Sequence, residues 1–256
     1  MLDHTVYERQ GVWWGEDALF NIIFTVFNPG RSAYIQRILA TQPNPTDKLQ
    51  MLDVGCGGGY LAESLAAAGA SVSGIDLAHN ALVAARTHAQ TQGYSIQYSV
   101  ANGERLPFAD ATFDVVYCCD VLQHVPDVAR IVAESARVLK PGGLYFFQTI
   151  NRTPLSYLAL IVLAQRWDHT SFLPLGSHQW SGFVPPSQLI GAMTSQRLTL
   201  RELLGFKSPR PLSALYQEVR RYKRGEISYD EFGRRIQFDT HPTDLSVSYI
   251  GYAQKL

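Results

Sequence analysis

The stretch LDVGCGGGY, from Leu52 to Tyr60, has four glycines in nine residues and decides the fold prediction. An apolar run precedes it and a helical pattern follows, so we expect a glycine-rich turn between a strand and a helix. Its spacing, D-x-G-x-G-x-G from Asp53, is neither the dinucleotide pattern G-x-G-x-x-G nor a P-loop, which would need G-K-[ST]. The carboxylate of Asp53 would repel a pyrophosphate and attract a cation. The turn is therefore predicted to bind a ligand other than a phosphate.

Short β-branched or aromatic runs alternate with helical patterns on both sides of this turn. Strands are expected in 48–55, 70–77, 95–102, 113–125 (running into a loop) and 144–150, and helices in 59–69, 78–93 and 127–143. This alternation indicates βαβ units and a parallel sheet, hence an α/β fold. Because ligands bind at the carboxyl ends of the strands in such sheets, functional residues should directly follow the strands.

Polar residues do follow the expected strands. Asp76 ends the second strand, where an acidic side chain can accept both hydroxyls of a ribose. Asn102 follows the third strand, where its side-chain amide can meet an adenine edge. Asp53 can attract an ammonium group, directly or through water. These positions suit a cofactor that contains an adenosine and an amino acid.

Composition narrows the class of function. Lysine plus arginine (22) equals aspartate plus glutamate (22), so the chain lacks the basic excess of nucleic-acid-binding proteins, and no nucleic-acid partner is expected. Cys56, Cys118 and Cys119 form neither a disulfide framework nor a zinc-site pattern. The first residues lack the apolar core of a signal peptide. We therefore expect a reduced, cytoplasmic protein.

Five motifs, LDVGCGGG, GIDL, ANGERLPF, FDVVYCCDVLQHV and LKPGG, resemble in sequence and order those of class I S-adenosylmethionine-dependent methyltransferases. The resemblance implies a doubly wound, mostly parallel, seven-stranded Rossmann-like sheet and S-adenosylmethionine as the cofactor. The cofactor-binding positions that it implies, or that the strand ends suggest, are Arg31, Asp53, Gly55, Gly57, Asp76, Leu77, Asn102, Gly103 and Cys119. The family often has aspartate where this chain has Asn102, and asparagine can also bond adenine.

The segments outside the motifs complete the expected domain organisation. Residues 1–46 are predicted to form an N-terminal helical extension, and 47–150 the S-adenosylmethionine-binding core. Residues 151–237 are predicted to form a cap on the acceptor side with strand elements, and 238–256 a C-terminal strand that completes the sheet. Within the cap, residues 214–237 are charged and helical in pattern. They form either a solvated helical face or a lid or dimer contact over the acceptor pocket.

A narrower resemblance covers nearly the whole chain. The segments WWGEDALFNIIFTVFNPGRSAYI, AESLAAAGASVSGID, NRTPLSYLALIV, LPLGSHQW and FVPPSQL are similar to the ubiquinone-biosynthesis O-methyltransferases. That family methylates a phenolic hydroxyl on a polyprenylated catechol-type ring. The resemblance implies that Arg31 contacts the methionine carboxylate of the cofactor, for which its planar fork is suited.

A phenol must lose its proton before it becomes a good nucleophile, and a general base or a metal can remove it. His124, after the fourth strand, and His178, in GSHQW, are the candidate catalytic residues, with His124 preferred. The family has E-x-x-E-H, linked to a divalent metal, where this chain has DVLQH. Asp120 and His124 are therefore candidate metal ligands, and dependence on Mg²⁺ is left open because one carboxylate makes a weak site.

Aromatic and apolar residues suggest how an acceptor is bound. Trp13, Trp14 and Trp180 are candidate walls of an acceptor site, with core packing as the alternative for the tryptophan pair. The apolar helix near 155–167 either packs under the cap or touches a membrane surface, where a prenylated substrate would be found. This would make the cytoplasmic protein membrane-associated.

Two other functions stay open at the level of the sequence. One is methylation of another small acceptor, such as an amine, a carboxylate or a secondary metabolite, at the same cofactor site without a metal. The other is binding of the cofactor without catalysis. The oligomeric state is not given by the sequence.

Overall fold

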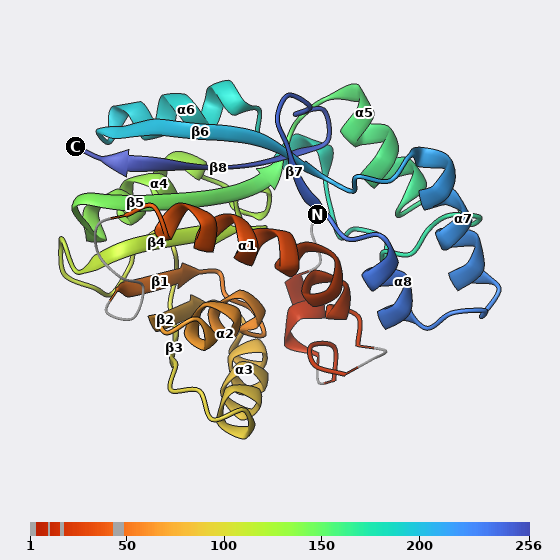
Figure 1. The fold of residues 1–256 in the computed structure, drawn as a ribbon, viewed down its shortest axis with the longest axis horizontal. Coiled ribbons are helices and arrows are strands. Elements are labelled where there is room, and N and C mark those ends of the chain that lie inside the picture. Colours follow the sequence, from red (N-terminus) through yellow and green to blue (C-terminus); the bar gives the residue numbers. More distant parts are fainter. Residues whose placement is uncertain (1–3, 10, 16–17, 43–48) are drawn as a thin grey trace.

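The computed structural model describes residues 4–9, 11–15, 18–42 and 49–256, and one sheet with helices on both faces dominates it (Figure 1). The described residues contribute eight strands to this sheet, in the order β3-β2-β1-β4-β5-β8-β6-β7. The strands are β1 (Gln50–Val54), β2 (Ser71–Asp76), β3 (Gln97–Val100), β4 (Phe113–Cys119), β5 (Leu139–Ile150), β6 (Leu198–Lys207), β7 (Asp239–His241) and β8 (Ser248–Lys255). The five strands from β1 to β5 pair in parallel, and β8, β6 and β7 pair antiparallel to their neighbours. The predicted α/β class is confirmed.

The sheet has one strand more than the predicted seven. The extra strand, β7, is short and pairs with β6 at the edge of the sheet. The chain after β7 packs closely on β6, where a Cβ at Gly205 would lie 1.9 Å from the carbonyl oxygen of Asp244. Residues 151–237 were predicted to form the cap. β6 lies in this range but pairs with β8 inside the sheet.

The helices cover the two faces of the sheet unequally. The α-helices are α1 (Asn28–Leu39), α2 (Tyr60–Ala67), α3 (His79–Thr91), α4 (Val128–Val138), α5 (Pro154–Ser156), α6 (Pro186–Ser195), α7 (Leu212–Lys223) and α8 (Tyr229–Arg235). The 3-10 helices are η1 (His4–Glu8), η4 (Leu122–His124) and η6 (Trp180–Gly182), and the π-helices are η2 (Ile23–Phe27) and η5 (Tyr157–Leu163). One face packs on α1, α2 and α3, and the other on α4 and α6.

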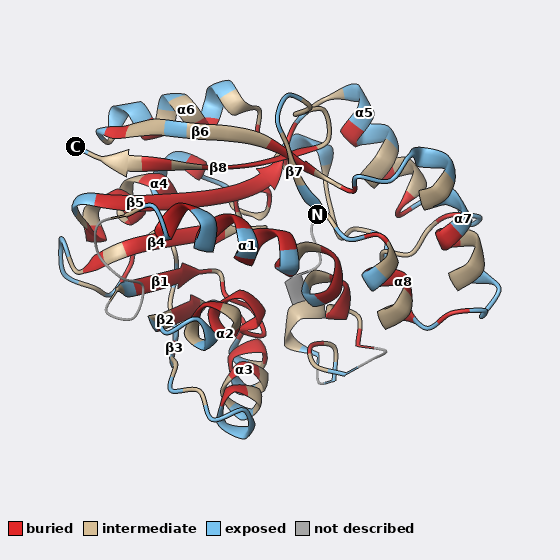
Figure 2. Cartoon of the chain, viewed as in Figure 1, coloured by how far each residue is buried: buried red, intermediate tan, exposed pale blue. Residues whose placement is uncertain are grey.

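The core follows the two-residue period of the strands. Along β4, Val115 and Tyr117 face the cluster under α1 to α3, whereas Val116 and Cys118 face the cluster under α4 and α6. All four side chains are buried, as is most of the central sheet (Figure 2). Strands buried on both faces explain why the sequence shows continuous apolar runs rather than alternation. The buried sheet fixes the strand ends that position the site.

Beyond the carboxyl ends of the strands lie α5, α7 and α8, on the right in Figure 1; η2 contacts α8, and η5 contacts α5. The charged segment 214–237, expected to be helical, forms all but the first two residues of α7 and the whole of α8, with a turn between them. The apolar segment near 155–167 is helical, as expected. No helix among the described residues has both the length and the hydrophobicity needed to cross a bilayer.

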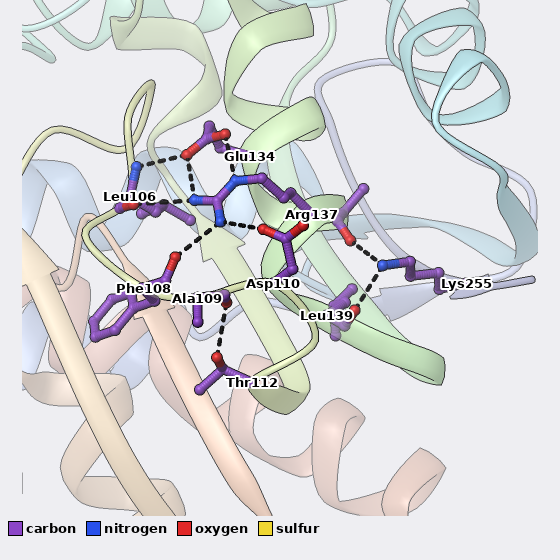
Figure 3. A network of polar contacts seen from close by, with 10 residues as sticks. Leu106, Phe108, Ala109, Asp110, Thr112, Glu134, Arg137, Leu139 and Lys255 are labelled. Atoms are coloured by element: carbon purple, nitrogen blue, oxygen red, sulfur yellow. Dashed lines mark hydrogen bonds and ion pairs between the residues drawn. The ribbon is translucent and has the colours of Figure 1, made fainter.

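A polar network fixes the loop between β3 and β4 to α4 (Figure 3). The guanidinium of Arg137 donates to the carbonyl oxygens of Leu106 (3.0 Å) and Phe108 (2.8 Å). It also pairs with Glu134 and Asp110, each at 2.8 Å. Glu134 in turn accepts from the backbone N–H of Leu106 at 2.8 Å. The loop that begins with the candidate adenine-binding residues is therefore held mainly by one arginine.

Arg137→Ala should lower the free energy of unfolding by about 1–3 kcal/mol, because it removes charge-assisted bonds to two backbone carbonyls as well as to Glu134. Asp110→Ala is the matched control. The Asp110 side chain is 79% exposed, so its loss should cost no more than about 1 kcal/mol. Urea denaturation of both variants measures the difference. Equal losses would show that the carbonyl contacts of Arg137 contribute nothing.

Candidate active site

A cavity of about 900 Å³ lies at the carboxyl ends of β1, β2, β4 and β5. This is the edge of the sheet where the sequence places its functional residues. Toward β2 and β3 the cavity is lined by Asp76, Leu77 and Asn102. Away from them its lining becomes apolar and comes from η2 and the segment after α8. Ligand pockets span roughly 300–1,000 Å³, so this volume has room for a cofactor and a second ligand.

The glycine turn forms the floor of the cofactor end. Gly55, Gly57 and Gly59 have φ values of +76°, +51° and +83°, in the left-handed region that favours glycine. A Cβ at Gly57 would lie 2.5 Å from Cη2 of Trp13, and a Cβ at Gly55 would lie 2.3 Å from a methyl group of Val121. Both the positive φ and the close packing therefore require glycine at Gly55 and Gly57.

Asp76 holds the turn from the neighbouring strand. Its two carboxylate oxygens accept from the backbone N–H of Gly57 (2.8 Å) and of Ala78 (2.9 Å). Asp53, at the end of β1, is only 4% exposed. Burial, and then the negative charge of Asp76, raise its pKa well above the usual range, while Arg31 and Tyr117 oppose the rise. A cationic ligand beside this carboxylate would reduce the cost of keeping it ionised.

The part of the cavity near β2 and β3, where an adenine is expected to bind, is lined by the predicted residues, and the structure adds the orientation of one side-chain amide. Leu77 lines the cavity and is 66% exposed, which leaves an apolar surface for a ring. The side-chain carbonyl of Asn102 already accepts from the backbone N–H of Glu104 at 2.8 Å. The donor half of the amide is thus the half suited to a base edge. A Cβ at Gly103 would lie 2.8 Å from Ile131, so this position also requires glycine.

Arg31 of α1 is buried in the middle of the cavity lining, with 2% exposure. Its guanidinium donates to the side-chain oxygen of Gln148 and lies 3.3 Å from a carboxylate oxygen of Asp120. It also lies over the ring of Phe27 at 5.1 Å. Arg31 therefore links the cofactor end, where it was predicted, to the candidate catalytic residues.

Asp120, His124 and His178 meet on the acceptor side of the cavity, where each offers a ligand atom within 4.8 Å of the others. The two imidazole centroids are 5.4 Å apart. Asp120 has a φ of +65°, an uncommon conformation for a residue with a side chain and one often found at functional sites. Burial alone would raise its pKa, but Arg31 and both histidines bring it below the usual value. The carboxylate is therefore ionised beside the histidine pair.

Burial also affects His178. It lowers the pKa of the imidazole, against a smaller opposing effect of Asp120. Its Nδ1 is buried and has no hydrogen-bond partner among the described residues. A neutral imidazole with an open nitrogen can accept a proton, so His178, one of the two predicted catalytic histidines, is suited to act as a base.

The donor set does not fit Mg²⁺, the metal that the family resemblance left open. Both oxygens of Asp120 are engaged: one faces Arg31 and the other accepts from the amide of Gln123 at 2.5 Å. The amide oxygen of Gln123 accepts from Thr149 at 2.7 Å, which fixes this orientation. Mg²⁺ prefers oxygen ligands, and a guanidinium beside the one carboxylate would repel a divalent cation.

The three tryptophans predicted as acceptor walls have different places. Trp13 lines the cavity and packs on the glycine turn. Trp14 is outside the cavity lining, because its indole N–H donates to the carbonyl of Gly58 at 2.8 Å and its ring stacks on His88. Trp180 is 42% exposed, also outside the lining, and donates to the carbonyl of Thr153 at 3.2 Å. The structure brings only Trp13 to the site.

Two elements of the site were missed by the sequence. Tyr7 of η1 lines the cavity and stands edge-on to His124, with ring centroids 6.3 Å apart. Its neighbour Glu8 accepts from the first backbone N–H groups of α3, those of His79 and Asn80, each at 2.9 Å. The second missed residue is Gln148, near the end of β5, which also lines the cavity. The position of Gln148 near the carboxyl end of a parallel strand was a usable signal, whereas nothing in the N-terminal sequence indicates the contacts of Tyr7.

Gly57→Ala should destabilise the protein and weaken S-adenosylmethionine binding at least about tenfold, because the new Cβ must displace the Trp13 ring. Gly93→Ala is the matched control: Gly93 also has a positive φ, of +78°, but a Cβ there would meet nothing within 4 Å. It should cost about 1–2 kcal/mol of stability and leave binding unchanged. Calorimetric titration distinguishes the two. Unimpaired binding by the Gly57 variant would contradict the packing argument.

Chelation should leave activity within about twofold of the untreated enzyme, because the residues around Asp120 do not suit a hard cation. In Gln123→Glu, a second carboxylate replaces the amide donor, and we expect lower activity that added Mg²⁺ partly restores. Initial rates with EDTA and with Mg²⁺ measure both. Loss of wild-type activity in EDTA with recovery in Mg²⁺ would contradict the predicted metal independence.

Comparison with known proteins agrees with the geometry. The sequence profile of the methyltransferase domain family matches residues 52–147. The chain is 42% identical over 194 residues to the ubiquinone biosynthesis O-methyltransferase of Hahella chejuensis, covering 75% of this chain and 78% of that protein. It is 39% identical over 206 residues to the enzyme of the same name from Thiobacillus denitrificans, covering 80% and 85%.

Solved structures show the same fold. The geranyl diphosphate C-methyltransferase of Streptomyces coelicolor aligns with a TM-score of 0.62 at 17% identity, covering 89% of this chain and 79% of that one. At this identity the likeness concerns the fold alone. The profile and the close relatives go further: the chain belongs to the ubiquinone biosynthesis O-methyltransferase family of S-adenosylmethionine-dependent methyltransferases.

Proposed function

We propose that this enzyme transfers the methyl group of S-adenosylmethionine to a phenolic hydroxyl of a prenylated catechol- or quinol-type ring. The observation that supports this most is the composition of the cavity at the carboxyl ends of the strands. Its lining includes the cofactor-end residues, a polar cluster of Asp120 and two histidines, and an apolar extension formed by η2 and the segment after α8. A ring with its hydroxyl at the cluster and its tail in the extension would satisfy both parts. The names of the relatives agree with such an acceptor.

Methyl transfer is an in-line displacement in which the phenolate oxygen forms a bond to the methyl carbon as the sulfonium–carbon bond breaks. The products are the methyl ether and neutral S-adenosylhomocysteine. Holding the two reactants in line supplies much of the acceleration. The glycine turn, Asp53 and Asp76 would hold the cofactor from one side, with Arg31 near the methionine carboxylate.

The proton of the phenol needs an acceptor, and we assign it to Nδ1 of His178. The imidazolium that forms would be stabilised by the ionised Asp120, which lies within the same cluster. Arg31 and Gln123 hold the two oxygens of Asp120 and so keep the carboxylate oriented. His124 lines the cavity beside His178 and would position the ring.

Access of a prenylated acceptor would be easiest from a membrane surface, and we extend the proposal to peripheral membrane contact. Apolar side chains are exposed on the helical segment and the loop beside the cavity: Leu155, Leu158, Trp167 and Leu175. Leu175 also lines the cavity, so the exposed surface reaches its entrance. Co-sedimentation with anionic liposomes tests this contact, and binding no higher than the background would refute it.

The acceptor assignment is tested by transfer from labelled S-adenosylmethionine to catechols and hydroxyquinols with and without prenyl tails. Turnover that is higher with a prenyl tail supports the proposal. Turnover of amines or carboxylates in preference to phenols would overturn it. Cofactor binding without turnover of any acceptor would leave the family assignment standing and contradict the acceptor class.

His178→Gln should lower kcat by about 10²–10⁴-fold, the usual contribution of a general base, while the dissociation constant of S-adenosylmethionine stays within about twofold. Because burial lowers the pKa of His178, its neutral form persists below the usual value of about 6.5. The acid limb of kcat/KM should therefore fall below that pH and disappear in the variant. An unchanged acid limb in the variant would exclude His178 as the base.

A further inference from the structure

The helical hairpin formed by α7 and α8 packs on η2 rather than on the sheet. A Cβ at Gly233 would lie 1.9 Å from Oγ1 of Thr25, so the backbone of α8 is in direct contact with η2. The side-chain amide of Asn21 donates to Asp230 at 3.0 Å. These contacts require glycine at one point of α8 and fix its distance from η2.

The interior of the contact is apolar. Phe232 of α8 is fully buried, and its ring centroid lies 5.3 Å from those of Phe172 and Tyr222. It belongs to one cluster with Ile22 and Ile236. The hairpin is thus packed as a core is packed, which makes a freely solvated helical face a poor description of residues 214–237.

The same cluster faces the cavity. Ile22, Ile23, Phe172, Ile236 and Phe238 all line the part of the cavity away from the cofactor end. None of these five side chains has a hydrogen-bonding group. After Ile236, the chain is held to η2 by the backbone N–H of Phe238, which donates to the carbonyl of Val26 at 2.9 Å. A wall of this kind can distinguish ligands only by length and bulk.

We propose that Ile236, directly after α8, and Phe172 form the end wall of the tail pocket, supported from behind by the α7–α8 hairpin, and that these two residues determine which prenyl length is accepted. This rests on the proposed function, because it takes the apolar extension to be the site of the tail. Ile236 is 6% exposed at the end of α8, where the backbone contacts of Gly233 and Phe238 on either side keep it from retreating. Phe172 closes the wall from the cap side.

The test compares kcat/KM for catechols whose tails differ by one isoprene unit. Ile236→Ala and Phe172→Ala should shift the longest accepted tail upward by at least one unit, and Ile236→Trp should shift it downward. The ratio of kcat/KM for the longer to the shorter substrate should change at least about tenfold in each case. Leu212→Ala is the control, because Leu212 lies on the same hairpin, is 79% exposed and is outside the cavity lining. Its ratio should equal that of the wild type.

If no catechol is turned over, the binding of prenyl alcohols tests the proposal instead. Geraniol, farnesol and geranylgeraniol would be titrated into each variant saturated with S-adenosylhomocysteine, and the order of affinities should shift in the same direction. Ratios and affinities that match the wild type in folded Ile236 and Phe172 variants would overturn the end-wall proposal. Shifted affinities without any turnover would uphold it and contradict the proposed acceptor instead.

Discussion

The ion pair between the buried Arg31 and the partly buried Asp120 is the interaction on which the site depends most. Two charges taken out of water cost several kcal/mol each unless their remaining bonding capacity is met. Here Gln148 accepts from the guanidinium and Gln123 donates to the carboxylate. The pair joins α1, which belongs to the N-terminal segment, to the strained residue that follows β4. Breaking it would leave an uncompensated charge in the middle of the cavity.

At the cofactor end the charges are not balanced, because two carboxylates give an excess of negative charge. Burial raises the pKa of both Asp53 and Asp76, and the negative charge of Asp76 raises the pKa of Asp53 further. Backbone N–H groups satisfy Asp76, whereas Asp53 has the nearby Arg31. The ammonium and sulfonium groups of S-adenosylmethionine would supply the positive charge that this arrangement lacks. Trp13 and Tyr7 of the N-terminal segment line the same cavity and would cover a ligand bound there.

The parts of this molecule that the sequence predicted are those with local signals. The glycine turn was predictable from the spacing of its glycines. Asp76 and Asn102 were predictable from their places at the ends of strands. Neighbours in sequence can lie on different sides of a turn, so the roles of Trp13 and Trp14 were not separable by motif. The contact of Ile236 with the cavity depends on the packing of α8 against η2, far away in the chain. The orientation of Gln123 depends on Thr149 and could not be predicted either.

A double-mutant cycle on Arg31 and Asp120 tests this account most directly. The free energy of unfolding would be measured for Arg31→Met, Asp120→Asn and the double variant by urea denaturation. We expect each single change to be strongly destabilising and the double change to cost at least about 1 kcal/mol less than their sum, because neither charge is then left unpaired. Additivity within about 0.5 kcal/mol would contradict the claim that this ion pair holds the two halves of the site together.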